Sequence, residues 1–249
     1  MVANLLSLLI YVSPQLPGDF EFINTWDLNI RISPFDIAFF DFKVLSFILM
    51  KQLSVLVFHD FETLDVFGPV EIFGRLTDHY SIKFYSLSGG LITNRHNVEI
   101  NTLPLEKIFD GTDIFLIPGG YGTRIEVNNF ILLDAIKKVC SKSNRIMTVC
   151  TGSGLLAKTG LLDHKNATSN KKAFDWASAQ SESVKWNKKA RWTKDDNYYT
   201  SAGVSAGMDL SLAILEEIHG KEFAEQVAFE IEYKWDREEK DDVFYLKYR

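Results

Sequence analysis

Cys150 is the residue whose surroundings best suit nucleophilic chemistry. It follows an apolar, β-branched stretch at residues 146–149 and precedes two glycines, after which residues 155–157 favour a helix. A strand, a sharp turn and a helix in this order form a nucleophile elbow, which presents a reactive side chain above a parallel sheet. The dipole of the helix stabilises a thiolate by at most about 2 kcal/mol, little more than one pKa unit. An ionised sulfur therefore needs a cation or a hydrogen-bond donor as well.

Asp65 is the candidate donor. It follows a predicted strand at residues 53–58 and lies between Leu64 and Val66, an apolar setting that favours the neutral carboxyl. A neutral carboxyl donates to a thiolate, and such a pair shares one proton. Two simpler interpretations remain open: Asp65 could only cap the following helix, and Cys150 could be a small buried hydrophobe.

A glycine-rich turn at residues 118–122 follows another apolar strand. If that strand neighbours the elbow, the N–H groups of Gly119 and Gly120, together with that of Thr151, stabilise a developing anion. We expect Gly119, Gly120 and Gly152 to bind this anion or the substrate. The glycines could instead serve only a tight turn.

Arg124 comes directly after this turn and could bind an anionic substrate, although a surface ion pair with Glu126 is the simpler interpretation. The five histidines are scattered, without the spacing of metal ligands. We expect no metal and no other cofactor. Two cysteines make no disulfide framework, and reduced thiols fit a cytoplasmic protein.

Apolar runs alternate with helical patterns from residue 50 onward, which predicts the elements that position these residues. We expect strands at 53–58, 80–87, 113–117 and 146–149, short strands at 167–169 and 198–200, and helices at 68–76, 128–142, 208–219 and 223–235. Pro69 is expected near the first turn of its helix. Strands separated by helices predict an α/β fold, a flavodoxin-like three-layer sandwich with a mostly parallel sheet.

Composition limits the partners. A net charge of −6 and a pI near 5.4 argue against nucleic acid and anionic membrane surfaces, and no apolar run reaches the roughly 18 residues of a membrane span. Residues 1–49 are rich in phenylalanine and show no clear period. We therefore expect the domain to occupy residues 50–249, beginning at Met50, and residues 1–49 to be an extension outside the fold.

Four motifs carry a resemblance to a known family. They are residues 64–73 (LDVFGPVEIF), 117–124 (IPGGYGTR), 149–153 (VCTGS) and 200–210 (TSAGVSAGMDL). In order and spacing, the chain resembles the ThiJ/PfpI superfamily over residues 53–235. It looks closest to the isonitrile hydratase-like branch, which pairs an aspartate in Leu-Asp-x-x-Gly-Pro with a Cys-Thr-Gly elbow.

The resemblance implies that Cys150 is the nucleophile, that Asp65 is its acid/base partner, that Thr151 assists through its hydroxyl or backbone, and that Gly120 contributes to the anion pocket. It further implies a small-molecule substrate, hydration of an isonitrile to an N-substituted formamide, and a homodimer. Protease-like members carry a histidine where Thr151 stands, and many members carry one where Asn170 stands.

Two other functions stay open. One is a glyoxalase- or deglycase-like stress enzyme, and the other a non-catalytic dimer that senses redox state through Cys150. Regulators of this superfamily add a helix-turn-helix domain, for which we expect no room after residue 235.

Overall fold

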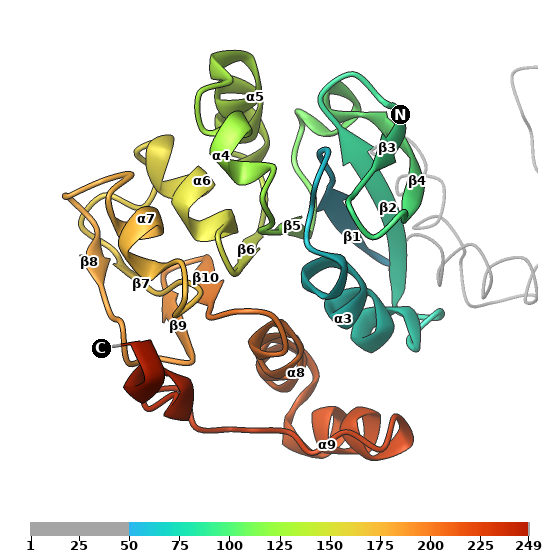
Figure 1. Cartoon of the computed structure of the whole chain (residues 1–249). Helices are drawn as coiled ribbons and strands as arrows, with labels where there is room; N and C mark the ends of the chain where they lie inside the picture. Colours follow the sequence, from blue (N-terminus) through green and yellow to red (C-terminus); the bar gives the residue numbers. More distant parts are fainter. Residues whose placement is uncertain (1–49, 249) are drawn as a thin grey trace, which may run out of the picture. The chain divides into compact units, whose positions relative to one another are not determined.

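An eight-stranded sheet with helices on both faces organises residues 50–248, the part of the chain that this computed structural model describes (Figure 1). The strand order is β3-β4-β2-β1-β5-β6-β10-β9. The strands are β1 (Lys51–Leu56), β2 (Tyr80–Ser86), β3 (Gly90–Thr93), β4 (Glu99–Pro104), β5 (Ile114–Ile117), β6 (Arg145–Val149), β9 (Trp192–Asp195) and β10 (Tyr198–Ser201). The extension expected at residues 1–49 lies outside the described residues.

The sheet is mostly parallel, as the sequence predicts. β1 pairs in parallel with β2 and β5, β6 pairs in parallel with β5 and β10, and β2 pairs in parallel with β4. Only β3 and β9, at the two edges, pair antiparallel to their neighbours. The carboxyl ends of β1, β5 and β6 therefore meet at one edge of the sheet, where sites in such folds lie.

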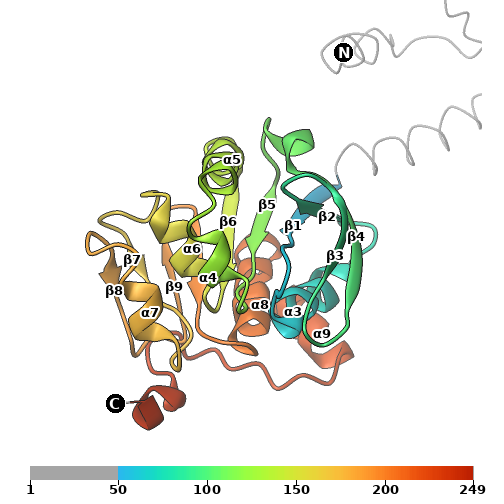
Figure 2. The same cartoon turned by 45° about the horizontal axis from the view of Figure 1, so that its top comes forward.

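Helices form the two outer layers (Figures 1 and 2). One layer contains α3 (Thr63–Gly74), α8 (Ala206–His219) and α9 (Lys221–Glu230), and the other contains α4 (Thr123–Glu126), α5 (Phe130–Cys140), α6 (Gly152–Lys158) and α7 (Phe174–Ser178). Two short 3-10 helices, η1 (Leu105–Ile108) and η2 (Val243–Tyr248), complete the described chain. This arrangement confirms the α/β sandwich.

The central strands form the core. Every residue of β5 is buried, and so are Leu53, Val55 and Leu56 of β1. Strands covered on both faces read as continuous apolar runs, which is why the sequence located β1, β5 and β6. It gave no such signal for β4, whose residues alternate between exposed and buried and include Asn101, Thr102 and Pro104.

Two local predictions are wrong. The helix expected from residue 68 begins at Thr63, so Pro69 lies inside it, where it cannot donate to the carbonyl of Asp65. The burial of Val66, Ile72 and Phe73 outweighs the missing hydrogen bond.

The second concerns the strand expected at residues 167–169. β7 (Asn166–Ala167) is shorter and pairs with β8 (Lys185–Trp186) in a separate two-stranded sheet. Thr168 and Ser169 instead donate side-chain hydrogen bonds to the backbone carbonyls of Asn187 and Cys150. These bonds compete with strand pairing.

Buried carboxylates attach the C-terminal segment to the domain. Asp209 on α8 accepts hydrogen bonds from Arg191 Nε at 2.9 Å and from the Tyr233 hydroxyl at 3.0 Å. Asp242, only 2% exposed, lies 3.6 Å from Arg191 Nη1 and 3.9 Å from Lys171 Nζ. Removing one member of such a network leaves a buried charge without compensation.

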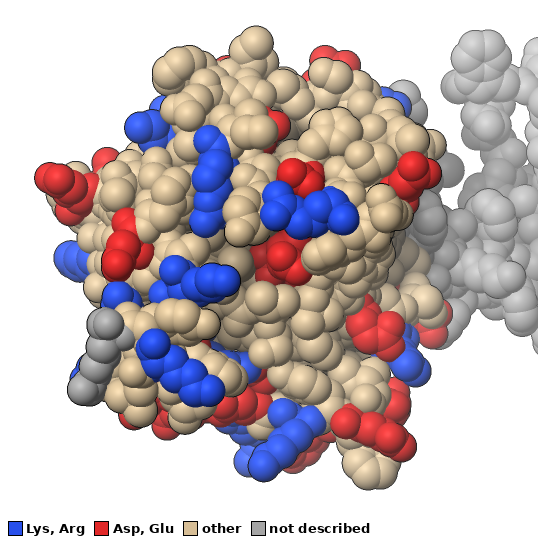
Figure 3. All heavy atoms as spheres, in the orientation of Figure 1, with Lys and Arg blue, Asp and Glu red and all other residues tan. Residues whose placement is uncertain are grey.

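The surface in the orientation of Figure 1 carries interspersed basic and acidic side chains (Figure 3). Among the residues described, no helix has the length and apolar character needed to cross a bilayer.

Candidate active site

Cys150 occupies a nucleophile elbow between β6 and α6. Its φ of +58° is left-handed, a conformation that costs about 1–2 kcal/mol for a residue other than glycine. The Cys150 N–H donates to the carbonyls of Ser201 at 3.2 Å and Ala202 at 3.1 Å. Its carbonyl accepts from the Ser153 and Ser169 hydroxyls, both at 2.9 Å. These four bonds hold the strained turn that aims the sulfur.

Asp65 lies beside this sulfur. It belongs to the first turn of α3, is 0% exposed, and accepts a hydrogen bond at Oδ2 from the Gly119 N–H at 3.0 Å. In the described part of the chain, Oδ1 is buried and has no hydrogen-bond partner. The carboxyl does not cap its own helix, whose N-cap is Glu62. The capping interpretation is therefore wrong.

The Asp65 carboxyl favours its neutral form. Burial raises its pKa well above the ordinary value, the charge of Glu62 raises it further, and the hydrogen bond from Gly119 opposes both effects. A neutral carboxyl with an unoccupied buried oxygen has a proton to give. This agrees with the expectation drawn from its apolar neighbours.

The resting thiol differs from expectation. Burial raises the pKa of Cys150, and the Asp65 charge raises it again, while the backbone N–H and hydroxyl of Thr151 lower it by hydrogen bonding. Cys150 is only 7% exposed, and α6 has just seven residues. Desolvation therefore outweighs the helix dipole, and the resting sulfur holds its proton.

The glycine turn approaches both Asp65 and Thr151. A Cβ added at Gly119 would stand 2.8 Å from Asp65 Oδ2 and 2.6 Å from the Thr151 nitrogen, so only glycine fits there without displacement. Gly152 approaches the end of β5 instead, since its added Cβ would stand 2.3 Å from the carbonyl oxygen of Ile117. Gly152 thus packs the elbow against the neighbouring strand.

The N–H groups expected to hold an anion have other partners. The Gly119 N–H donates to Asp65, and the Gly120 N–H donates to Thr151 Oγ1 at 3.1 Å. In the resting state the two glycine N–H groups therefore position the side chains of Asp65 and Thr151. The backbone N–H of Thr151 is the donor that reaches the Cys150 sulfur.

The structure favours a functional role for Arg124, whereas the sequence favoured a surface ion pair. Its Nη1 donates to Thr151 Oγ1 at 3.2 Å and to the Gly120 carbonyl at 3.0 Å. Its guanidinium lies 4.1 Å from the centre of the Trp176 ring. The surface pair with Glu126 is wrong, because Glu126 accepts from its neighbour Asn129 and no ion pair joins it to Arg124 among the described residues.

Arg124 also senses the charge of the sulfur. Burial lowers the pKa of its guanidinium, whereas a negative charge on Cys150 raises that pKa. By linkage, a positive charge on Arg124 favours the ionised form of Cys150. Arg124 is therefore a candidate for the cation that an ionised Cys150 needs besides the helix dipole. This role of Arg124 could not be predicted from its neighbours in sequence, because Thr151 lies at the start of α6 and Trp176 lies in α7.

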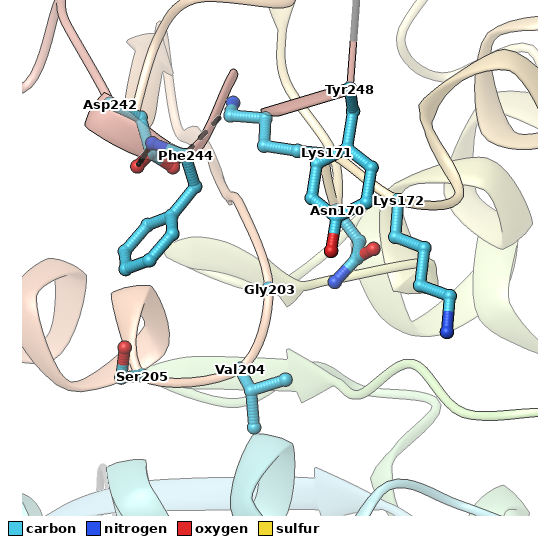
Figure 4. Close-up of a pocket in the computed structure, with 9 residues that line it drawn as sticks. All are labelled: Asn170, Lys171, Lys172, Gly203, Val204, Ser205, Asp242, Phe244 and Tyr248. Atoms are coloured by element: carbon cyan, nitrogen blue, oxygen red, sulfur yellow. Dashed lines mark hydrogen bonds and ion pairs between the residues drawn. The ribbon is translucent and has the colours of Figure 1, made fainter. Parts of the chain in front are cut away.

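A cavity of about 310 Å³ opens next to the elbow (Figure 4). It is lined by Asn170, Lys171, Lys172, Gly203, Val204, Ser205, Asp242, Phe244 and Tyr248. Its lining residues Asn170 and Gly203 directly follow Ser169 and Ala202, which form hydrogen bonds with the Cys150 backbone. Neither Cys150 nor Asp65 lines the cavity. Asn170 accepts the Ala173 N–H at 3.1 Å.

The fold, the elbow and the motif order can be compared with known proteins. The model of the DJ-1/PfpI family matches residues 51–217. The chain belongs to the DJ-1/PfpI family. The resemblance inferred from four motifs is confirmed over residues 51–217.

Relatives of this DJ-1/PfpI protein include proteins of two kinds. The chain is 27% identical over 184 residues to isonitrile hydratase from Pseudomonas putida, covering 73% of this chain and 78% of that protein. It is also 27% identical over 184 residues to the HTH-type transcriptional regulator CdhR from Pseudomonas aeruginosa, covering 73% of this chain but 52% of that protein. Family membership alone therefore leaves the activity open.

Solved structures agree on the fold. A ThiJ/PfpI family protein from Pseudomonas syringae has a TM-score of 0.68 and 27% identity, covering 75% of this chain and 76% of that one. Drosophila melanogaster DJ-1beta has a TM-score of 0.65 and 22% identity, covering 75% of this chain and all of that one. The second likeness bears on the fold alone.

Proposed function

We propose that this DJ-1/PfpI protein is a cysteine-dependent hydratase that converts a small electrophilic carbon compound, an isonitrile, to an N-substituted formamide. The observation that carries the proposal is the Asp65 carboxyl, fully buried, of raised pKa and beside the Cys150 thiol. Isonitrile hydration needs one sulfur nucleophile and one proton carrier. Both are present without a histidine, which fits Thr151 and Asn170 at the two positions where other members carry one.

In the first step the Cys150 sulfur forms a bond to the terminal carbon of the isonitrile. Asp65 transfers its proton to that same carbon and takes up the thiol proton at its other carboxyl oxygen, so a thioimidate results and Asp65 stays neutral. The Thr151 N–H and the Arg124 guanidinium stabilise the sulfur while it carries negative charge.

In the second step water hydrolyses the thioimidate. Its oxygen bonds to the carbon while one proton goes to nitrogen. The carbon–sulfur bond then breaks, the remaining hydroxyl proton passes through Asp65 to the sulfur, and the formamide leaves. Sulfur and carboxyl return to their starting states, so no external oxidant, reductant or cofactor is consumed.

The test is formation of N-cyclohexylformamide from cyclohexyl isocyanide, followed by chromatography. We expect product with the unmodified chain and none with Cys150→Ala. Cys140→Ala is the matched control, because Cys140 is the other cysteine, is equally buried and lies in α5, outside the site. Product from Cys150→Ala would overturn the proposal. Methylglyoxal consumption that depends on Cys150, without formamide, would replace it with the glyoxalase-like function.

A further inference from the structure

Arg124 has hydrogen-bond donors that the protein leaves unused. Its Nη1 donates to three oxygens, those of Gly120, Thr123 and Thr151, at 3.0, 2.9 and 3.2 Å. Its Nε and Nη2 have no acceptor among the described residues, and neither atom is sealed away from solvent. A guanidinium has five N–H donors in a planar fork that fits a carboxylate with two parallel hydrogen bonds.

The absence of a carboxylate partner sets this arginine apart. Each of the other arginines in the described range forms an ion pair with Asp or Glu: Arg75, Arg95, Arg145, Arg191 and Arg237. Arg124 is half-buried, and burial lowers its pKa. The fold has partly desolvated the Arg124 charge without pairing it with an anion. A bound anion would therefore stabilise this charge.

The orientation of the guanidinium is fixed before any ligand arrives. It lies 4.1 Å from the ring centre of Trp176 and 5.6 Å from that of Tyr121. Its Nη1 shares Thr151 Oγ1 with the Gly120 N–H. A ligand held by Arg124 thus lies next to the residue that follows the nucleophile. Such preorganisation reduces the entropy lost on binding.

We propose that Arg124 binds a carboxylate of the substrate, so that the substrate class is a small electrophile bearing a carboxylate, with its reactive carbon directed at the Cys150 sulfur. The reaction type rests on the proposed hydratase function. The proposed carboxylate site does not depend on hydration, because the reactivity of Cys150 is enough to test it.

The experiment compares alkylation of Cys150 in the full chain by iodoacetate and by iodoacetamide, which differ in the carboxylate. We expect the ratio of the iodoacetate rate to the iodoacetamide rate to fall about tenfold in Arg124→Gln, the size of one hydrogen bond to a charged group. Arg124→Lys keeps part of the ratio, because an ammonium keeps the charge but not the fork. Arg95→Gln is the control, since Arg95 also stacks on Tyr121 but pairs with Asp60.

Two results would overturn the proposal. One is an unchanged ratio in Arg124→Gln. The other is an equal loss for both reagents, which means that Arg124 only stabilises the thiolate. In either case urea denaturation reports whether the variant is folded.

A parallel assay separates the two proposals. If isocyanoacetate is hydrated with a higher kcat/KM than its methyl ester, and this preference disappears in Arg124→Gln, both proposals hold. If neither isonitrile reacts while the alkylation ratio behaves as expected, the carboxylate site stands and the hydratase function falls. If isocyanoacetate and its methyl ester are hydrated equally and the alkylation ratio is unchanged in Arg124→Gln, the hydratase function stands and the carboxylate site falls.

Discussion

The negative charge of Asp65 raises the pKa of the Cys150 thiol, and burial of both groups disfavours either one as an anion. The two side chains therefore act as a coupled pair that resists losing both of its protons. In the proposed reaction, the sulfur carries charge next to the Thr151 N–H and Arg124.

Thr151 is expected to have both a structural and an electrostatic role. Thr151→Val removes the hydroxyl that accepts the Gly120 N–H and Arg124 Nη1, which leaves a buried donor unpaired and lowers the free energy of unfolding by about 1–3 kcal/mol. The pKa of Cys150 rises, because this hydroxyl lowers it. Urea denaturation and the pH profile of iodoacetamide labelling measure the two effects. Thr151→Ser keeps the hydroxyl and should resemble the unmodified chain; equal behaviour of the two variants would contradict this role.

Gly119 is expected to tolerate no side chain. The Cβ of Gly119→Ala would stand 2.6 Å from the Thr151 nitrogen and 2.8 Å from Asp65 Oδ2, so the variant loses about 1–3 kcal/mol of stability through overpacking and separates the coupled pair. Hydration should fall at least about tenfold. Gly74→Ala is the control, since its Cβ meets only the Ile82 side chain at 3.5 Å. An active, stable Gly119→Ala chain would refute the close approach.

Lys171 is expected to make stability depend on alkaline pH. Burial, opposed by Asp242, lowers its pKa from 10.5 to about 8. Between these values the unfolded chain binds more protons than the folded one, so the free energy of unfolding rises with pH, by an amount on the order of 3 kcal/mol. Below about pH 8 the full penalty of the buried charge is present.

The measurement is urea unfolding from pH 7 to 10.5 for the unmodified chain and for Lys171→Met. The difference between the two curves isolates this lysine from the other groups that titrate in that range. Lys172→Met is the control, because the neighbouring Lys172 side chain is exposed. A Lys171→Met curve parallel to that of the unmodified chain would contradict the lowered pKa.

The sequence predicted those parts of the site whose signals are local. An apolar strand ending at Cys150 and followed by glycines is a pattern of adjacent residues, and so is the apolar setting of Asp65. Buried parallel strands were equally visible, because both of their faces are apolar. Strands β3 and β4 were not, since half of the residues in each of them are exposed and their pattern resembles a loop.

The rest depended on residues distant in sequence. Arg124 is two residues from Glu126, which made a surface pair the simple interpretation, whereas its observed partners Thr151 and Trp176 arrive through β6, α6 and α7. The direction of the Cys150 pKa depended on burial, which the sequence of an elbow does not reveal. Likewise, the partners taken by the Gly119 and Gly120 N–H groups follow from where α3 and the elbow meet.

The most direct test of the coupled pair is Asp65→Asn, assayed for both sulfur reactivity and hydration. Asparagine keeps an acceptor for the Gly119 N–H but has no charge and no acidic proton. Because asparagine cannot become an anion, the pKa of Cys150 should fall, so that iodoacetamide labels it faster at the pH values at which Asp65 is ionised, while cyclohexyl isocyanide hydration drops by about 100-fold or more. Faster labelling with lost hydration is the predicted result. Hydration that survives in Asp65→Asn, or labelling that slows with it, would contradict the account.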